Sequence, residues 1–253
     1  MDRRKKPRSP APDTNPITSM KIAFLHAGFP PGQLEAEHGD YLSMFRSAFL
    51  GLDRAVELVD FQVQNGLFPD PTEGFDAYLC CGSASSVTEA EPWIEQLLEF
   101  VRTVDQKGDR LVGICFGHQL VAQALGGTVE RARSGWGLGV KRAGITKPQP
   151  WMQPRLDGVN LLYSHQDQVT SLPGFARVTL QTDHCPIAGF QIDNRFLTFQ
   201  GHPEFNPAYL EALMEDRRPL IGDGPVDRAL ESLNNQTDNQ QIMSWILSFL
   251  AQS

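Results

Sequence analysis

Residues 110–127 read RLVGICFGHQLVAQALGG, an apolar run that passes through Gly113, Cys115 and Gly117 into an Ala-rich periodic stretch. The first part predicts a short buried strand and the second a helix, with the cysteine at their junction. The same alternation precedes it, with strands predicted at 21–27, 55–63 and 75–82 and helices at 41–52 and 91–106. Near-continuous apolar strands separated by helices indicate an α/β fold: an open, mostly parallel sheet flanked by helices.

The pattern changes after residue 127. Short extended segments separated by Gly, Pro, Asp or Asn predict antiparallel strands added to, or packed beside, the parallel sheet. Residues 207–216 and 239–251 are predicted helices, and the polar stretch 217–238 is predicted to be a solvated loop. No candidate linker divides residues 20–253, so we expect one domain there, preceded by a disordered basic tail over residues 1–19.

The composition is that of a globular protein, with 41% hydrophobic and 21% charged residues. The net charge is −8, but residues 1–19 hold five basic and two acidic residues, which leaves −11 on the body. An acidic body argues against nucleic-acid binding by the fold itself. The RRKKPR segment at 3–8 could act as a nuclear-import or polyanion-binding tag, although we favour a non-functional leader. No apolar run is long enough for a membrane helix, and no secretory signal pattern is present.

The four cysteines do not have the spacing of a disulfide scaffold or of a C-x-x-C metal site. We therefore expect a reducing, cytoplasmic setting and neither a metal nor another cofactor. They are Cys80, Cys81, Cys115 and Cys185.

Cys115 has the surroundings of a nucleophile on a sharp strand–helix turn. Such a turn holds its central residue in strained backbone angles and needs glycines beside it, which Gly113 and Gly117 supply. The start of the following helix favours a thiolate. A buried, inert cysteine at a packed junction would leave a similar pattern, so this motif alone leaves both readings open.

A thiol nucleophile needs a base, and the base needs an orienting acceptor. The segment FQGHPEF at 199–205 offers both, because His202 and Glu204 lie two residues apart and fall on the same side of an extended chain. Pro203 biases His202 toward that extended conformation. Other histidines are weaker candidates: His26, His38 and His184 lack a nearby same-face carboxylate, and His118 is too close to Cys115 in sequence to reach back.

Acyl chemistry also needs backbone N–H groups that stabilise the oxyanion. In a nucleophile elbow the next residue, Phe116, supplies one. The small-residue loop CCGSASS at 80–86 can supply the second, most plausibly from Gly82, although alone it reads as an ordinary Gly/Ser turn.

Together, GICFGHQLVAQALGG, CCGSASS, YSHQDQV and FQGHPEF resemble the class I, triad-type glutamine amidotransferases, most closely the GMP synthase-like branch, over residues 21–206. The resemblance implies that Cys115 is the nucleophile, His202 the base and Glu204 its partner, with an oxyanion hole at Gly82 and Phe116. It further implies that Gln119, His165 and Asp167 contact substrate. The family's usual Gly-Gly-Pro-x-Ser loop is replaced here by residues 81–85, which questions the rigidity of that loop.

The resemblance implies a hydrolase that cleaves a γ-glutamyl amide through a cysteine thioester, with glutamine or a γ-glutamyl peptide as substrate. We expect release of ammonia and glutamate, with the ammonia passed to a separate acceptor or synthetase. No synthetase motif follows the amidotransferase unit, so GMP synthesis by this chain alone is not expected. A stand-alone γ-glutamyl peptide hydrolase is the alternative. A non-catalytic binding protein is a third hypothesis, which the intact Cys115, His202 and Glu204 argue against.

Overall fold

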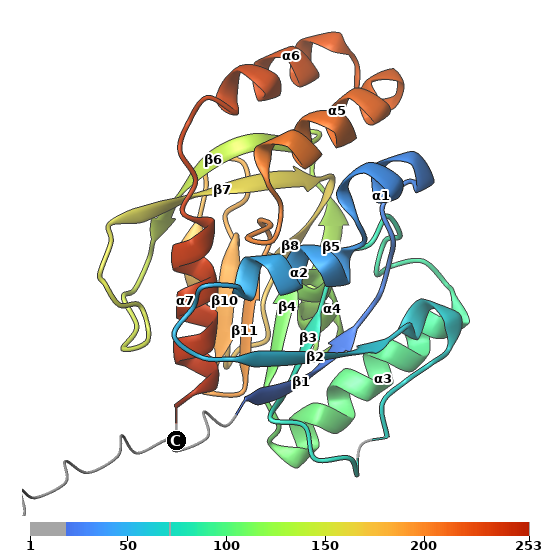
Figure 1. Cartoon of the computed structure of the whole chain (residues 1–253), viewed down its shortest axis with the longest axis vertical. Helices are drawn as coiled ribbons and strands as arrows, with labels where there is room; N and C mark the ends of the chain where they lie inside the picture. The colour runs from blue at the N-terminus through green and yellow to red at the C-terminus, as the bar shows by residue number, and fades with distance from the viewer. Residues whose placement is uncertain (1–18, 71, 253) are drawn as a thin grey trace, which may run out of the picture.

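A computed structural model of the chain describes residues 19–70 and 72–252 (Figure 1). Apart from Ser19, the predicted basic tail lies outside the described residues. Within the described residues, nine strands form one sheet and two more form a separate small sheet.

The first half of the large sheet is parallel. In sheet order its strands are β2 (Val56–Phe61), β1 (Met20–Leu25), β3 (Ala77–Cys80), β4 (Leu111–Ile114) and β11 (Phe196–Phe199). This is the flavodoxin-like order, in which ligands bind beyond the carboxyl ends of the strands. The three central strands β3, β4 and β11 are buried at every residue, because helices cover both faces of the sheet. The predicted α/β class is therefore confirmed.

The second half of the large sheet is antiparallel and continues from β11. Its strands are β10 (Gly189–Ile192), β9 (Arg177–Gln181), β6 (Gly137–Ile145) and β7 (Gly158–His165). The separate pair is β5 (Thr128–Arg131) with β8 (Asp167–Ser171). The antiparallel strands predicted after residue 127 are thus confirmed for β5 to β10, most of them as an extension of the parallel sheet. The prediction was wrong for β11, which pairs in parallel with β4 because its fully buried residues complete the central part of the sheet.

Helices pack around this sheet in two groups and an outer pair. On one side α3 (Pro92–Lys107) contacts α4 (Phe116–Ala124), and on the other α2 (Tyr41–Phe49) contacts α7 (Asn239–Leu250). The outer pair, α5 (Pro207–Ile221) and α6 (Asp223–Ser232), lies beside β6 and β7 (Figure 1). A short helix α1 (Gly32–His38) and a 3-10 turn η1 (Val63–Asn65) complete the described elements.

The structure adds a helix and corrects one expectation from the sequence. The stretch after β1, for which no element was predicted, contains α1, a helix with one buried residue, Leu34. The predicted loop 217–238 is mostly helical, because α5 runs to Ile221 and α6 follows directly. Val226 and Ala229 of α6 are buried, and the helix packs on β6, so apolar contact stabilises a segment that reads as polar.

No helix among the described residues is long and apolar enough to cross a membrane.

Candidate active site at the carboxyl edge of the sheet

Cys115 occupies the turn between β4 and α4 in a strained conformation. Its φ is 53° and its ψ is −99°, a region that non-glycine residues rarely adopt and that costs about 1–3 kcal/mol. Two backbone hydrogen bonds hold it there: its N–H donates to the Phe199 carbonyl at 2.8 Å, and its carbonyl accepts from the Gln119 N–H at 3.1 Å. Strain at a cleft residue fixed from both sides is typical of a functional position.

The glycines around the turn are required by close packing. A Cβ on Gly113 would collide with the carbonyl oxygen of Gly117. A Cβ on Gly117 would lie 2.5 Å from the carbonyl oxygen of Cys80 in β3. The absence of both side chains lets the start of α4 sit directly against the strand ends, which brings the amides of its first turn beside Cys115.

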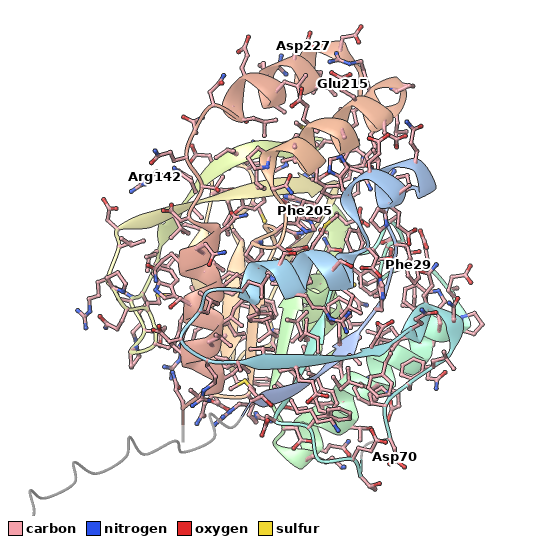
Figure 2. The ribbon with its side chains drawn as sticks, in the orientation of Figure 1. Phe29, Asp70, Arg142, Phe205, Glu215 and Asp227 are labelled. Carbon is pink, nitrogen blue, oxygen red and sulfur yellow. The ribbon has the colours of Figure 1, made fainter. Side chains whose placement is uncertain are left out.

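His202 and Glu204 form a buried pair two residues apart. His202 Nδ1 lies 2.8 Å from Glu204 Oε1, and the two residues are 3% and 6% exposed. The His202 N–H donates to the Leu162 carbonyl at 2.8 Å, which fixes the backbone beside β7. Phe205 stacks on the imidazole, with ring centroids 3.9 Å apart and planes within 6°. Figure 2 shows Phe205 in the interior of the molecule, between α5 and α2.

The surroundings of His202 favour its charged form. Burial opposes the charge, but the Glu204 carboxylate and then the nearby Cys115 side chain raise the pKa of His202 to about 10. Since Nδ1 is engaged by Glu204, Nε2 is the nitrogen available to the Cys115 sulfur. The structure therefore places Cys115 and His202 at the same small cavity, with Glu204 bound to His202.

The other described cysteines are held as neutral thiols. Burial raises the pKa of Cys81 and of Cys185 to about 12, and raises that of Cys80 well above its usual value.

Gly82 and Phe116 both border the candidate nucleophile. A Cβ on Gly82 would lie 3.0 Å from His202 Cε1 and 3.8 Å from the Cβ of Cys115. Phe116 is the first residue of α4, where the helix offers its amide no acceptor. The unusual loop is also anchored, because the Cys81 sulfur accepts a hydrogen bond from the Ala27 N–H at 3.3 Å. The loop is therefore tied to the end of β1 despite its departure from the family pattern.

A small pocket of about 130 Å³, open to solvent, is lined in part by Cys115. Gln119, His165 and Asp167, the predicted substrate contacts, all line this pocket. Gln119 Nε2 donates to the Asp167 carbonyl at 2.8 Å and to Gln200 Oε1 at 3.1 Å, so both of its N–H groups are engaged. His165 Nδ1 donates to the same Asp167 carbonyl at 3.0 Å, and burial lowers the pKa of His165 to about 3, which keeps it neutral.

The expectation that His26 lacks a nearby carboxylate was wrong. This buried histidine does have a carboxylate partner, since its Nδ1 lies 3.1 Å from Asp60 Oδ1, in the neighbouring strand β2. His118 is excluded as the base for a different reason from its position in the sequence. Burial lowers its pKa to about 3, and its Nδ1 lies 2.8 Å from the Thr198 hydroxyl inside the fold.

Three residues near Cys115 were not predicted. Gln200 contacts the sulfur, Phe205 covers the His202 ring, and Arg217 lines the pocket from α5. Phe205 follows the HPE segment directly and could have been noticed, whereas Gln200 and Arg217 reach the site only through strand register and helix packing.

The fold and this arrangement define a class of α/β protein in which a cysteine on a strand–helix elbow meets a His–Glu pair beyond the carboxyl ends of parallel strands. The family model described as glutamine amidotransferase class-I matches residues 41–217, and the chain belongs to that family.

Similar proteins point in the same direction. Gamma-glutamyl peptidase 2 of Arabidopsis thaliana is 29% identical over 84% of this chain and 88% of its own length. Gamma-glutamyl-L-1-hydroxyisopropylamide hydrolase of a Pseudomonas species is 31% identical over 69% of this chain and 61% of its own length. A glutamine amidotransferase structure from Thermotoga maritima aligns with a TM-score of 0.71, 17% identity and coverage of 92% and 99%. This chain is thus a glutamine amidotransferase-type hydrolase by family.

Proposed function

We propose that the protein hydrolyses a γ-glutamyl amide bond, with Cys115 as nucleophile, His202 as general acid and base, and Glu204 orienting the imidazole. The observation that carries this proposal is the connected contact from Cys115 through His202 to Glu204, in which Nδ1 and Oε1 are 2.8 Å apart. The names of the similar proteins support the same chemistry.

The reaction proceeds by acyl transfer. The Cys115 thiolate adds to the γ-carbonyl, and the N–H groups of Gly82 and Phe116 stabilise the oxyanion, at roughly 2.7–4 kcal/mol for one donor. The oxyanion collapses to a thioester as the C–N bond breaks, and His202 gives its proton to the leaving amine. His202 then removes a proton from water, which attacks the thioester, releases glutamate and restores the thiolate.

The glutamyl part of the substrate would lie against Gln119, His165 and Asp167, which line the pocket. Because both N–H groups of Gln119 are engaged, its carbonyl oxygen is the atom left to accept a hydrogen bond from an α-ammonium group. The Asp167 carboxylate lies at the same end, 3.7 Å from the Arg131 guanidinium. Neutral His165 holds the Asp167 backbone in place through the shared carbonyl.

The leaving group is proposed to be an amino acid or peptide amine rather than ammonia. Arg217 borders both the main pocket and a small cavity that includes Gly82, Cys115 and His202. Its guanidinium donates to the Ser164 hydroxyl at 3.0 Å and lies 5.7 Å from the centre of the Trp136 ring. Among the ion pairs of the described residues none involves Arg217. A cation with these partners suits the carboxylate of a peptide leaving group.

From the sequence, ammonia release was the first expectation and peptide hydrolysis the alternative. The present proposal prefers peptide hydrolysis. The names of the relatives favour a peptide, and ammonia has no carboxylate for Arg217 to bind. Ammonia release to a separate synthetase remains the second candidate, and a cytoplasmic location remains part of the proposal.

The neighbouring arginine supplies a matched control. Arg218 is bound by the carboxylates of Glu215, Asp223 and Asp227, away from the pocket. Figure 2 shows Glu215 and Asp227 at the outer helices. Removing Arg218 therefore removes the same charge from α5 without changing the site.

The test compares glutamate release from glutamine and from a γ-glutamyl dipeptide. Cys115→Ala should abolish both activities, and equal rates for this variant and the wild type would refute the proposal. Arg217→Ala should lower kcat/KM for the dipeptide by about tenfold or more, because a hydrogen bond to a charged group is lost, and should leave glutamine hydrolysis nearly unchanged. Arg218→Ala should match the wild type on both. Faster turnover of glutamine than of the dipeptide would favour the ammonia-releasing candidate.

A further inference from the structure

Strand register places Gln200 beside the candidate nucleophile. Strands β4 and β11 are parallel neighbours in which Phe199 pairs with Ile114. The residues that follow these two, Gln200 and Cys115, therefore lie side by side at the carboxyl edge of the sheet. The hydrogen bond from the Cys115 N–H to the Phe199 carbonyl fixes this alignment. Gln200 is fully buried, which is unusual for an uncharged polar side chain of its length and calls for hydrogen-bond partners.

Those partners form a relay that ends on the sulfur. Gln200 Nε2 lies 3.5 Å from Cys115 Sγ, and Gln200 Oε1 accepts from Gln119 Nε2 at 3.1 Å. Gln119 Nε2 donates its other hydrogen to the Asp167 carbonyl at 2.8 Å.

The direction of this relay is fixed at its far end. A backbone carbonyl can only accept a hydrogen bond, so the Gln119 amide must turn its nitrogen toward Asp167. Its second N–H then meets Gln200, which must present its oxygen there and therefore its nitrogen to Cys115. The relay thus sets a donor, and not an acceptor, against the sulfur.

We propose that Gln200 is a further catalytic residue, whose carboxamide N–H holds the Cys115 sulfur as a thiolate, with Gln119 as the positioning residue that orients it. A buried donor aimed at an anion stabilises the charged form, and charge-assisted hydrogen bonds are the stronger ones. His202 supplies the positive charge beside the thiolate, and Gln200 supplies a second contact that stays neutral when His202 gives up its proton. The proposal rests on Cys115 being the nucleophile of the proposed function.

This assignment gives Gln119 a second role. Gln119 is expected from the sequence to contact substrate, yet both of its N–H groups donate within the relay. Substitution of Gln119 should therefore alter the reactivity of free Cys115, before any substrate is present.

The test measures alkylation of Cys115 by iodoacetamide as a function of pH, followed by intact mass, with Cys115→Ala to identify the modified site. In Gln200→Met, which keeps the length of the side chain but removes its N–H, we expect the midpoint of reactivity to rise by about one pH unit, or about tenfold slower alkylation below the midpoint. Gln119→Met, which leaves the donor but removes its anchor, should give a smaller shift in the same direction. Gln191→Met, on the neighbouring strand β10, should behave as the wild type.

A purely structural role for Gln200 would lower the thermal midpoint of Gln200→Met and leave its alkylation profile in place. Folded Gln200→Met with the wild-type profile would overturn the proposal. If that variant does not fold, a wild-type profile in Gln119→Met would overturn it instead. Alkylation needs no γ-glutamyl substrate. If the variants show these shifts and the wild type hydrolyses no γ-glutamyl amide, the result would contradict the proposed function alone.

Discussion

Replacing Gly82 by alanine should disable the site without unfolding the protein. The added Cβ would lie 3.0 Å from His202 Cε1, closer than carbon atoms normally approach, so the imidazole must move by a few tenths of an ångström. The ring has little freedom to do so. Phe205 covers one of its faces at a centroid distance of 3.9 Å, and Glu204 holds Nδ1 at 2.8 Å.

Gly82→Ala should affect both the free energy of unfolding and the rate of catalysis, but to different degrees. Overpacking of a buried site costs typically 1–3 kcal/mol, which a domain of this size tolerates. A displaced base and a shifted oxyanion donor affect the reaction more, since misplacement by about 1 Å can cost about 100-fold in rate. We expect kcat of Gly82→Ala to fall by about 10- to 100-fold, with a modest fall in thermal midpoint.

The assay is glutamate release from a γ-glutamyl dipeptide, with thermal unfolding measured on the same samples. Gly174→Ala is the matched control, because a Cβ there has no atom within 4 Å. Wild-type kcat in Gly82→Ala would refute the reasoning, since it would mean that the imidazole is not confined between Gly82, Phe205 and Glu204.

Three further predictions concern the partner of His202, the pH dependence of stability and the protection of buried thiols. Glu204→Gln should lower kcat by roughly 10³- to 10⁴-fold, because the amide no longer holds the imidazolium or its tautomer; kinetics on the dipeptide measure this, and an unchanged kcat would contradict the assigned role of Glu204. The pKa of His202 is raised to about 10 in the folded protein, so its contribution to stability should be complete below about pH 6.5 and be lost as the pH rises through 10. Urea unfolding at several pH values should show this loss in the wild type and much less of it in Glu204→Gln. Iodoacetamide should label the native protein once, at Cys115, and two or more labels would show that burial does not protect the remaining thiols. These are Cys80, Cys81 and Cys185.

The sequence was sufficient to predict four of the parallel strands, β1 to β4, and the meeting of Cys115 with His202 and Glu204, although β11 was expected to be antiparallel. Each depends on a local signal: an apolar run, a Gly-x-Cys-x-Gly turn, or a His and a carboxylate two residues apart. The parallel topology then brings the strand ends together, whatever the details of packing.

The features that escaped prediction depend on contacts between distant segments. Gln200 meets Cys115 only because β4 and β11 pair in one particular register, across 85 residues of sequence. The partner of His26 lies across a strand pair in the same way. The helix α6 was missed because residues 217–238 are mostly polar, and the few apolar residues of the helix become informative only when β6 is present to cover them.

One consequence concerns how substitutions would be tolerated at position 167. The carbonyl oxygen of Asp167 accepts from both Gln119 and His165, and it is a main-chain atom. Every amino acid carries that atom, so replacing the Asp167 side chain leaves the Gln200 N–H directed at the Cys115 sulfur. Inserting or deleting a single residue nearby would move the carbonyl and disturb that orientation. Substitutions at position 167 would therefore not show that its carbonyl helps to orient the donor at Cys115, whereas insertions and deletions beside it would.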